Sequence, residues 1–390
     1  MLDAGVSSVG TSYVLAGVRT PRGKGSPKGA LHAITPQALV TGLLDVLGPK
    51  LAGAQIDDVI LGCAAQTGDQ AGNLARAATL AAGWDAAIPG VMINRFCASG
   101  IDAINLAAAR VRAGDATLII AGGVESVSRT PPLEIAPGTI HMGVAADLVA
   151  TLEGIEREAC DEYAAVTRAK AVRARAEGHR RSIVPVRAGD RVVLDHDENV
   201  AYQPSADELA ALPPLFGEYG HDPIALARYP QLATIRHLHT RGSSPSLADA
   251  SALVAIGDRA TAERLGLAPR ARILATATCA GDPVAMLTAG QTALERALAK
   301  AGLRAADLDV VEFAEAFAAL CVRIMRDLDL GHDRLNPNGG TIALGHAYGA
   351  TGAVLMVDAL DELERRGAHY AAIAVSGAAG LGSAAIIERA

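Results

Sequence analysis

Short continuous runs of valine, isoleucine, leucine and alanine alternate along the chain with longer segments in which apolar residues recur at helical spacing. A continuous apolar run is typical of a strand that is buried on both faces of a sheet. Such runs predict strands at 57–61, 116–121, 252–256, 310–313 and 371–375. The segments between them predict helices at 101–111, 157–177, 292–301 and 353–366. This alternation of strands and helices predicts an α/β fold.

The order of these elements occurs twice. The sequence IDDVILGC at 56–63 has a counterpart in DLDVVEFAEA at 307–316. A glycine-containing turn that opens a helix follows Asn94, and a similar turn follows Asn336. The simplest interpretation is two similar α/β halves packed together.

The stretch between about residues 125 and 246 fits neither half, because it is rich in proline and charge and contains one amphipathic helix. Insertions of this size usually form a binding site or an interface. We therefore expect three parts. They are an N-terminal half made of 1–124 and 246–267, an inserted loop domain at 125–245 that binds substrate, and a C-terminal half at 268–390.

Composition and charge restrict the possible functions. Of the 390 residues, 50% are hydrophobic and 20% are charged, which predicts an ordered globular chain. The net charge is −7 and 3% of the residues are aromatic, so we expect no nucleic-acid partner and no anionic membrane partner. No apolar run is long enough to span a bilayer. Residues 1–20 lack the pattern of a signal peptide.

The cysteines predict neither a disulfide framework nor a zinc ribbon. There are five of them, an odd number, and no two stand in a C-x-x-C spacing. His237 and His239 flank Leu238 without a third ligand nearby, so we expect no metal site. These features fit a reducing, cytoplasmic location.

Cys97 and His346 are the main candidates for chemistry. Cys97 lies in N-R-F-C-A-S-G directly before a predicted helix, where the helix dipole and free N–H groups favour a lowered thiol pKa. A packed structural cysteine is the alternative. His346 lies in a glycine-rich turn, either as a base for a cysteine or as a turn residue bonded to the backbone. These glycines lack the spacing of a P-loop or dinucleotide fingerprint, so we expect no nucleotide cofactor.

Several motifs together resemble those of the thiolase family, the β-ketoacyl-CoA thiolases and acetyl-CoA acetyltransferases. The likeness extends over nearly the whole chain, and the motifs occur in the family's order. They are R-T-P-R-G at 19–23, N-R-F-C-A-S-G at 94–100, G-G-V-E-S-V-S-R at 122–129, H-M-G-V-A-A-D at 141–147, E-A-F-A at 315–318, N-P-N-G-G-T-I-A-L-G-H at 336–346 and G-L-G-S-A at 380–384. The resemblance implies the thiolase fold, with two βαβαβαββ halves in a five-layer αβαβα arrangement and a loop domain inserted in the first half.

The resemblance also implies a ping-pong acyl transfer. Cys97 would attack a thioester and become acylated, and His346 would activate its thiol. The backbone N–H groups of Cys97 and Ala378 would form an oxyanion hole, a role that needs no particular side chain. The acyl donor would be a CoA or carrier-protein thioester, used as a substrate without a further cofactor.

The residues implied to contact that substrate come from three segments. Met142 would border the acyl pocket, with His141 beside it; without the resemblance, packing for Met142 and surface exposure for His141 are the alternatives. Ala316 and Phe317 would line the pantetheine tunnel. Ser244 lies in the loop implied to contact the CoA arm, although that loop reads G-S-S-P-S here, where the family has a pattern like G-N-x-S-G.

Other positions depart from the family's pattern. The second catalytic cysteine, which moves a proton at the α-carbon of the incoming thioester, is replaced by Ser376. A hydroxyl is a far weaker acid than a cysteine thiol, whose ordinary pKa is about 8.5. The asparagine of the other oxyanion hole is replaced by Ala314, and loss of one such donor commonly slows a reaction on the order of 100-fold. The proline after the catalytic histidine is Ala347.

Three hypotheses follow. The first is a thiolase-fold acyltransferase that passes an acyl group from Cys97 to an acceptor, in a biosynthetic role. The second is a working thiolase in which a water or Tyr348 replaces the lost proton carrier. The third is a structural subunit without activity. The segment between Arg129 and His141 is shorter than the family norm by about one hairpin, which favours a homodimer over a tetramer.

Overall fold

The apolar runs of the sequence form the strands of one large mixed sheet in the computed structural model, which describes residues 10–133 and 136–390. Residues 1–9 of the expected N-terminal half lie outside the described residues. The strands are β1 Tyr13–Arg19, β2 Gly23–Lys24, β3 Asp58–Gly62, β4 Gly90–Ile93, β5 Leu118–Ser126, β6 Val186–Ala188, β7 Arg191–Leu194, β8 Ala248–Gly257, β9 Ala271–Ala280, β10 Val310–Phe313, β11 Tyr370–Ser376 and β12 Leu381–Arg389. The helices are α1 Pro36–Leu47, α2 Leu74–Ala81, α3 Ser99–Ala113, α4 Met142–Glu153, α5 Arg157–Ala176, α6 Ala206–Ala210, α7 Asp222–Arg228, α8 Arg259–Arg264, α9 Ala289–Ala301, α10 Ala318–Leu328, α11 Thr341–Leu344 and α12 Thr351–Arg366.

The strand order confirms the duplication. It is β10-β11-β12-β9-β1-β8-β5-β3-β4, with β2 paired to β8. In one half β3 and β5 are parallel, β8 is antiparallel to β5, and β1 is antiparallel to β8. In the other half β10, β11, β12 and β9 repeat the same pattern. The halves meet where β1 pairs with β9.

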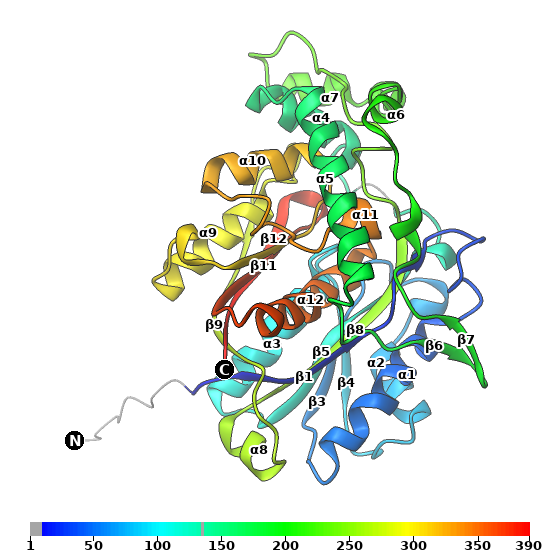
Figure 1. Cartoon of the computed structure of the whole chain (residues 1–390), viewed down its shortest axis with the longest axis vertical. Helices are drawn as coiled ribbons and strands as arrows, with labels where there is room; N and C mark the ends of the chain where they lie inside the picture. Colours follow the sequence, from blue (N-terminus) through cyan, green and yellow to red (C-terminus); the bar gives the residue numbers. More distant parts are fainter. Residues whose placement is uncertain (1–9, 134–135) are drawn as a thin grey trace.

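The elements form the expected five layers. Helices α3 and α12 lie between the two halves of the sheet and share one apolar core with the inner faces of both. Helices α1 and α2 cover the outer face of the first half, and α9 and α10 cover that of the second. Figure 1 shows α3 and α12 in the middle of the molecule, with the two outer pairs on opposite sides. The fold expected from the resemblance is therefore confirmed.

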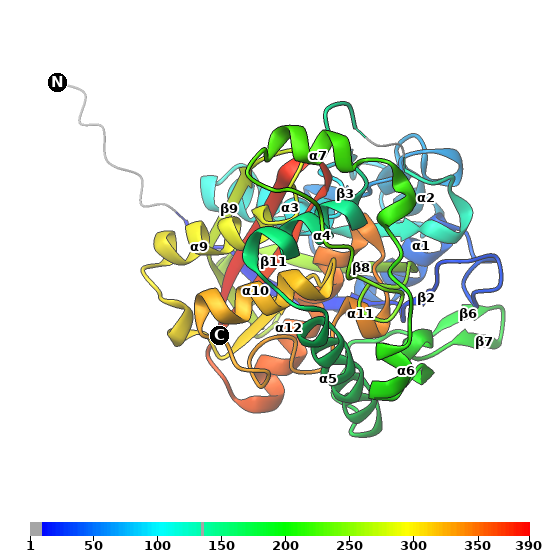
Figure 2. The same cartoon turned by 90° about the horizontal axis from the view of Figure 1, so that it is seen from above.

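The predicted strands are present, and β10 has the predicted ends, while the ends of the other four differ. The strand predicted at 116–121 begins at Leu118 and continues through two glycines to Ser126, because β5 pairs with both β3 and β8. The segment between β5 and β8 contains α4 to α7 and the β6–β7 hairpin. Figure 1 shows α4 to α7 gathered at one end of the molecule, and Figure 2 looks down on them. No helix in the described part of the chain combines the length and apolarity of a membrane span.

A buried cluster of charges joins the inserted segment to both halves. Arg19 and Arg22 of the R-T-P-R-G motif each contact Asp197 of the insertion and Asp358 of α12, at distances of 2.7–3.1 Å. Burial opposes the charged form of Asp197, but the arginines, with Arg180 also nearby, outweigh it and hold its pKa far below the ordinary range. The motif is therefore part of the fold's framework.

We expect Asp358→Ala to lower the free energy of unfolding by about 3–5 kcal/mol, because it leaves buried guanidinium groups without a partner. Urea denaturation followed by circular dichroism measures this change. Glu156→Ala is the control, since its ion pair with Arg236 is largely exposed, and it should change stability much less. An equally small effect of both substitutions would contradict the structural role of the cluster.

Candidate active site

Cys97 is held at the start of α3 by a tight turn. Phe96 has a φ of +48°, and its N–H donates to Asn94 Oδ1 at 2.8 Å. The Ser99 hydroxyl donates to the Phe96 carbonyl at 2.6 Å. The helix begins at Ser99, so the thiol lies where the N–H groups of a helix lack partners within it.

The thiol is buried, with 2% of Cys97 exposed. Burial and the charge of Glu125 raise the pKa of Cys97 to about 12, although the backbone N–H groups of Cys97 and Ala378 act in the opposite direction. The expectation of a lowered pKa is therefore wrong for the net shift, because burial outweighs the effect of the helix start. The unliganded thiol is protonated at neutral pH and needs a base.

His346 lies between α11 and α12, on the other half of the chain. Its N–H donates to the Ser246 carbonyl at 2.7 Å, and its carbonyl accepts from the Ala248 N–H at 3.1 Å. Its Nδ1 is 2.8 Å from Thr351 Oγ1. Burial, together with the charge of Arg22, lowers the pKa of His346 to about 4. The imidazole is therefore neutral at physiological pH and able to accept a proton.

Glycines allow the His346 loop to pack closely against the start of α3. A Cβ on Gly100 would lie 2.6 Å from the Gly349 carbonyl oxygen. A Cβ on Gly349 would lie 2.6 Å from the Ala64 nitrogen. The glycine-rich sequences around Cys97 and His346 thus permit the two halves to meet at this point.

Glu125 connects the segment at 64–65 to the His346 loop through hydrogen bonds, and its sequence position alone did not indicate this role. Its carboxylate accepts from the backbone N–H groups of Ala64, Ala65 and Gly349 at 2.8–3.0 Å, and from Gln70 Nε2 at 2.8 Å. Burial raises the pKa of Glu125 despite these bonds. The sequence does contain a signal for this role, because Glu125 is a charged residue in an otherwise apolar strand. A buried carboxylate needs several hydrogen-bond donors around it.

Tyr348 follows the catalytic candidate His346 and lies against it. The ring centroids are 5.6 Å apart in an edge-to-face arrangement. Tyr348 has a φ of +32°, an unusual conformation for a bulky residue. Within the described residues no direct hydrogen bond joins the Cys97 thiol to the His346 ring, an arrangement common in unliganded sites.

Ser376 and Ala314, two of the positions that depart from the family's pattern, form hydrogen bonds with the surrounding backbone. The Ser376 hydroxyl donates to the Leu287 carbonyl at 2.6 Å and accepts from the Gly290 N–H at 2.9 Å. The Ala314 N–H donates to the Ala374 carbonyl at 3.0 Å, and its methyl group offers no donor. Neither residue therefore presents a free polar hydrogen in this state.

A cavity of about 430 Å³ opens beside the thiol. Phe96, Ala378 and Tyr348 form the end next to Cys97, while His141 and Met142 line it from the start of α4. The structure thus brings Ala378, His141 and Met142 to one cavity, which reaches Phe96 next to the buried Cys97, while the His346 ring packs against Tyr348 of the cavity wall.

Ser244, Ala316 and Phe317 are buried beside one another but do not line this cavity. The Ala318 N–H donates to the Ser243 carbonyl at 3.0 Å, which joins their two loops. Among the described residues the Ser244 hydroxyl oxygen is buried without a hydrogen-bond partner. An unpaired buried hydroxyl of this kind is suited to a ligand's polar group.

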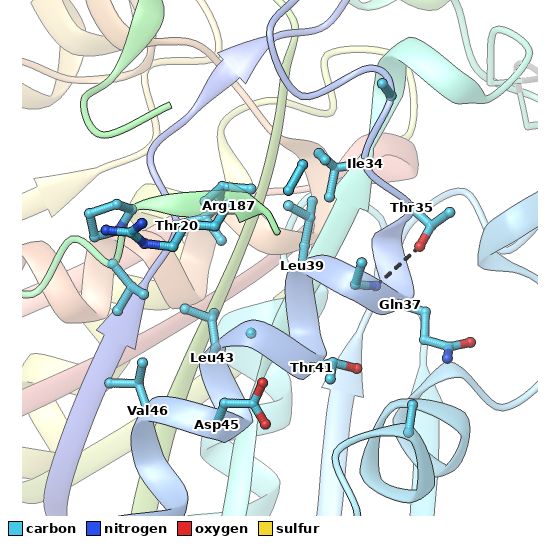
Figure 3. A pocket seen from close by; sticks show the side chains of 18 residues that line it. Thr20, Ile34, Thr35, Gln37, Leu39, Thr41, Leu43, Asp45, Val46 and Arg187 are labelled. Atoms are coloured by element: carbon cyan, nitrogen blue, oxygen red, sulfur yellow. Dashed lines mark hydrogen bonds between the residues drawn. The ribbon is translucent and has the colours of Figure 1, made fainter. Parts of the chain in front are cut away.

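A second, larger cavity lies elsewhere. Its volume is about 830 Å³, and it separates α1 from the segment 184–188. Figure 3 shows Leu39, Leu43 and Val46 of α1 lining it, with Arg187 opposite. Neither Cys97 nor His346 contributes to it, so its size does not make it the active site. No cluster of three metal-ligating side chains occurs in residues 10–133 and 136–390.

Comparison with known proteins identifies the family. Residues 12–138 and 133–221 match the family model described as "Thiolase, N-terminal domain", and residues 267–389 match "Thiolase, C-terminal domain". The chain belongs to the thiolase family, whose members are acyltransferases, and it is therefore an enzyme of the acyltransferase class.

The similar proteins cover the whole fold. The chain is 36% identical to the 3-oxoadipyl-CoA/3-oxo-5,6-dehydrosuberyl-CoA thiolase of Escherichia coli strain K12, over 97% of this chain and 99% of the relative. It is 33% identical to the 3-ketoacyl-CoA thiolase of Bacillus subtilis strain 168, with the same coverage. The crystal structure of the Bacillus anthracis acetyl-CoA acetyltransferase superposes with a TM-score of 0.88 at 30% identity, covering 98% of this chain and 100% of that one.

Proposed function

We propose that the protein forms an acyl-enzyme on Cys97 from an acyl-CoA thioester and transfers the acyl group to an acceptor in a biosynthetic pathway. The observation that carries this proposal is the thiol beside a cavity, with the N–H groups of Cys97 and Ala378 directed at its sulfur. Five free cysteines and a CoA donor fit the reducing cytoplasm. A homodimer remains our expectation.

The acylation step uses two neutral groups. His346 removes the proton from the Cys97 thiol as the sulfur attacks the thioester carbonyl. The carbon–sulfur bond to CoA breaks, and the CoA thiolate leaves with the proton from His346. The N–H groups of Cys97 and Ala378 stabilise the oxyanion of the tetrahedral intermediate. The acceptor then attacks the acyl-enzyme, and its proton returns the Cys97 sulfur to the thiol form.

The CoA arm would pass the buried Ser244 hydroxyl, whose unpaired oxygen can bond to a pantetheine amide. The thioester itself would then reach the cavity between His141 and Cys97.

Intact-mass spectrometry after incubation with acetyl-CoA tests the proposal. We expect an acetyl adduct in a one-to-one ratio with the protein, located at Cys97 by peptide mapping, with release of free CoA. A carrier-protein thioester is the second donor to use. No adduct with either donor would contradict the proposal.

A thiolase that cleaves or forms carbon–carbon bonds is the second candidate. The names of the relatives, including 3-ketoacyl-CoA thiolase, favour it. The engaged Ser376 hydroxyl and the methyl group of Ala314 argue against ordinary α-proton transfer. Release of acetyl-CoA from 3-ketoacyl-CoA and free CoA distinguishes the two functions, because simple acyl transfer to another acceptor needs no such cleavage.

If thiolysis occurs, we expect Tyr348→Phe to slow it by about 100-fold or more while leaving the acylation of Cys97 unchanged. The phenol lines the cavity beside His346 and would supply the proton that the missing cysteine carries. Steady-state thiolysis and single-turnover acylation measure the two effects. Tyr219→Phe is the matched control, since Tyr219 also lines the cavity but stacks on His141. Equal thiolysis by wild type and Tyr348→Phe would remove Tyr348 from the reaction.

A further inference from the structure

The cavity beside Cys97 has the position and size of an acyl pocket. It is lined by Phe96, the residue before Cys97, and by Ala378, whose backbone N–H acts on the thiol, and it extends to His141 and Met142 at the start of α4. Its volume of about 430 Å³ lies within the range of roughly 300–1,000 Å³ that is usual for small-molecule sites. An acyl group on Cys97 would therefore extend into this space.

The wall of the cavity is predominantly apolar. Much of it comes from residues 130–133 and 136–140 of the proline-containing segment that precedes α4. The principal apolar side chains are Pro131, Pro132, Leu133, Ile140, Met142 and Met286. Among the described residues that line the cavity there is no lysine, arginine, aspartate or glutamate.

The arginines next to these segments are already paired. Arg95, beside Phe96, bonds to Asp102 at 2.8 Å. Arg129, at the start of the short segment, bonds to Asp69 and donates to the His32 carbonyl at 2.7 Å. Neither guanidinium is thus available to an anionic ligand without giving up a carboxylate.

Among the described residues of the wall, His141 is the one titratable base, and it is neutral. Its Nδ1 accepts a hydrogen bond from the Gly143 N–H at 3.1 Å, which requires an unprotonated nitrogen. Its ring stacks on Tyr219 with centroids 3.9 Å apart. Burial, together with His221, lowers the pKa of His141. It therefore supplies no positive charge.

We infer that this cavity takes an uncharged, apolar acyl group and discriminates against an acyl group with a distal carboxylate. An ionised carboxylate in this cavity would lose its hydration and meet no cation, which strongly disfavours its binding. The inference rests on the proposed function. It also separates this chain from the relatives that are named for 3-oxoadipyl-CoA, a thioester whose acyl group ends in a carboxylate.

The test compares hexanoyl-CoA with adipyl-CoA, which have equal chain length and differ in the distal carboxylate. We expect the second-order rate constant for acylation of Cys97 to be on the order of 100-fold larger for hexanoyl-CoA. Equal rate constants, or a larger one for adipyl-CoA, would overturn the inference.

Binding to the Cys97→Ala variant keeps the inference separate from the proposed function. Calorimetry with the same two thioesters should show tighter binding of hexanoyl-CoA. If neither thioester acylates the wild type but this difference in affinity persists, the proposed function fails and the pocket's selectivity stands. If the affinities are equal, the selectivity fails whatever the acylation result.

A cation added to the wall should reverse the preference. Leu133 is half-buried in a loop, so Leu133→Arg can be accommodated without disturbing the core. We expect it to raise the adipyl-to-hexanoyl ratio of acylation rate constants by about tenfold or more. Leu133→Gln is the matched control for size and polarity and should leave the ratio within about threefold of wild type. An equal change of the ratio in both variants would mean that charge does not determine the selectivity.

Discussion

Cys97→Ala is expected to abolish covalent acylation of the protein by acyl-CoA. Cys97 is the proposed nucleophile and lies next to Phe96 of the 430 Å³ cavity, and the methyl group of alanine cannot form a thioester. Because Cys97 is packed at the start of α3, loss of its sulfur should leave the helix intact. Intact-mass spectrometry with acetyl-CoA measures the loss of the adduct, and circular dichroism verifies the fold.

Cys160→Ala is the matched control. Cys160 is also a buried, free cysteine, but it lies in α5 of the inserted segment, in the apolar cluster that this segment shares with the second half. This variant should acylate as the wild type does. An adduct that survives in Cys97→Ala and disappears in Cys160→Ala would place the nucleophile elsewhere and overturn the proposed mechanism.

His346→Gln is expected to slow acylation of Cys97 by about 10²–10⁴-fold. The pKa of Cys97 is raised to about 12, so almost no thiolate exists at neutral pH without a base. Glutamine preserves much of the size and polarity of histidine but accepts no proton at this pH. Single-turnover acylation, followed by release of free CoA, gives the rate constant. His369→Gln is the control, because His369 is exposed at the far end of β11.

The pH dependence of acylation provides a second test of His346. Its pKa is lowered to about 4, so the imidazole is neutral and active as a base above that pH. The acylation rate constant should stay level through pH 6–7 and fall only as the pH approaches about 4, instead of falling near about 6.5 as for an ordinary histidine. Circular dichroism at each pH separates this effect from unfolding. A midpoint near 6.5 would show that the ring is not buried in the active state.

Much of the fold follows from local sequence. The apolar runs predicted β3, β8, β10 and β11, and the repeat of motifs predicted two halves with the same strand order. Gly367 directly follows the helix predicted at 353–366 and has a φ of +64° at the end of α12. A few neighbouring residues are enough to predict these features. A strand buried on both faces requires a continuous apolar run, and the end of a helix favours glycine.

The motifs also selected residues that lie around the Cys97 sulfur. Cys97 and Ala378 come from different halves, yet both N–H groups act on the Cys97 thiol. The sequence alone could not give the direction of the thiol's pKa shift, because that depends on burial and on Glu125, which approaches from β5. Likewise, only the tertiary structure shows that the Ser376 hydroxyl bonds to Leu287 and Gly290.

The sequence by itself determined the family and the fold and selected Cys97 and His346 as candidates for the nucleophile and its base, since short motifs encode the turns that hold them. The tertiary structure decided the protonation states of Cys97 and His346 and the absence of charged side chains from the described wall of the cavity beside Cys97. Both properties depend on which distant side chains surround a buried group and whether nearby charges are already paired, and neither leaves a pattern along the chain.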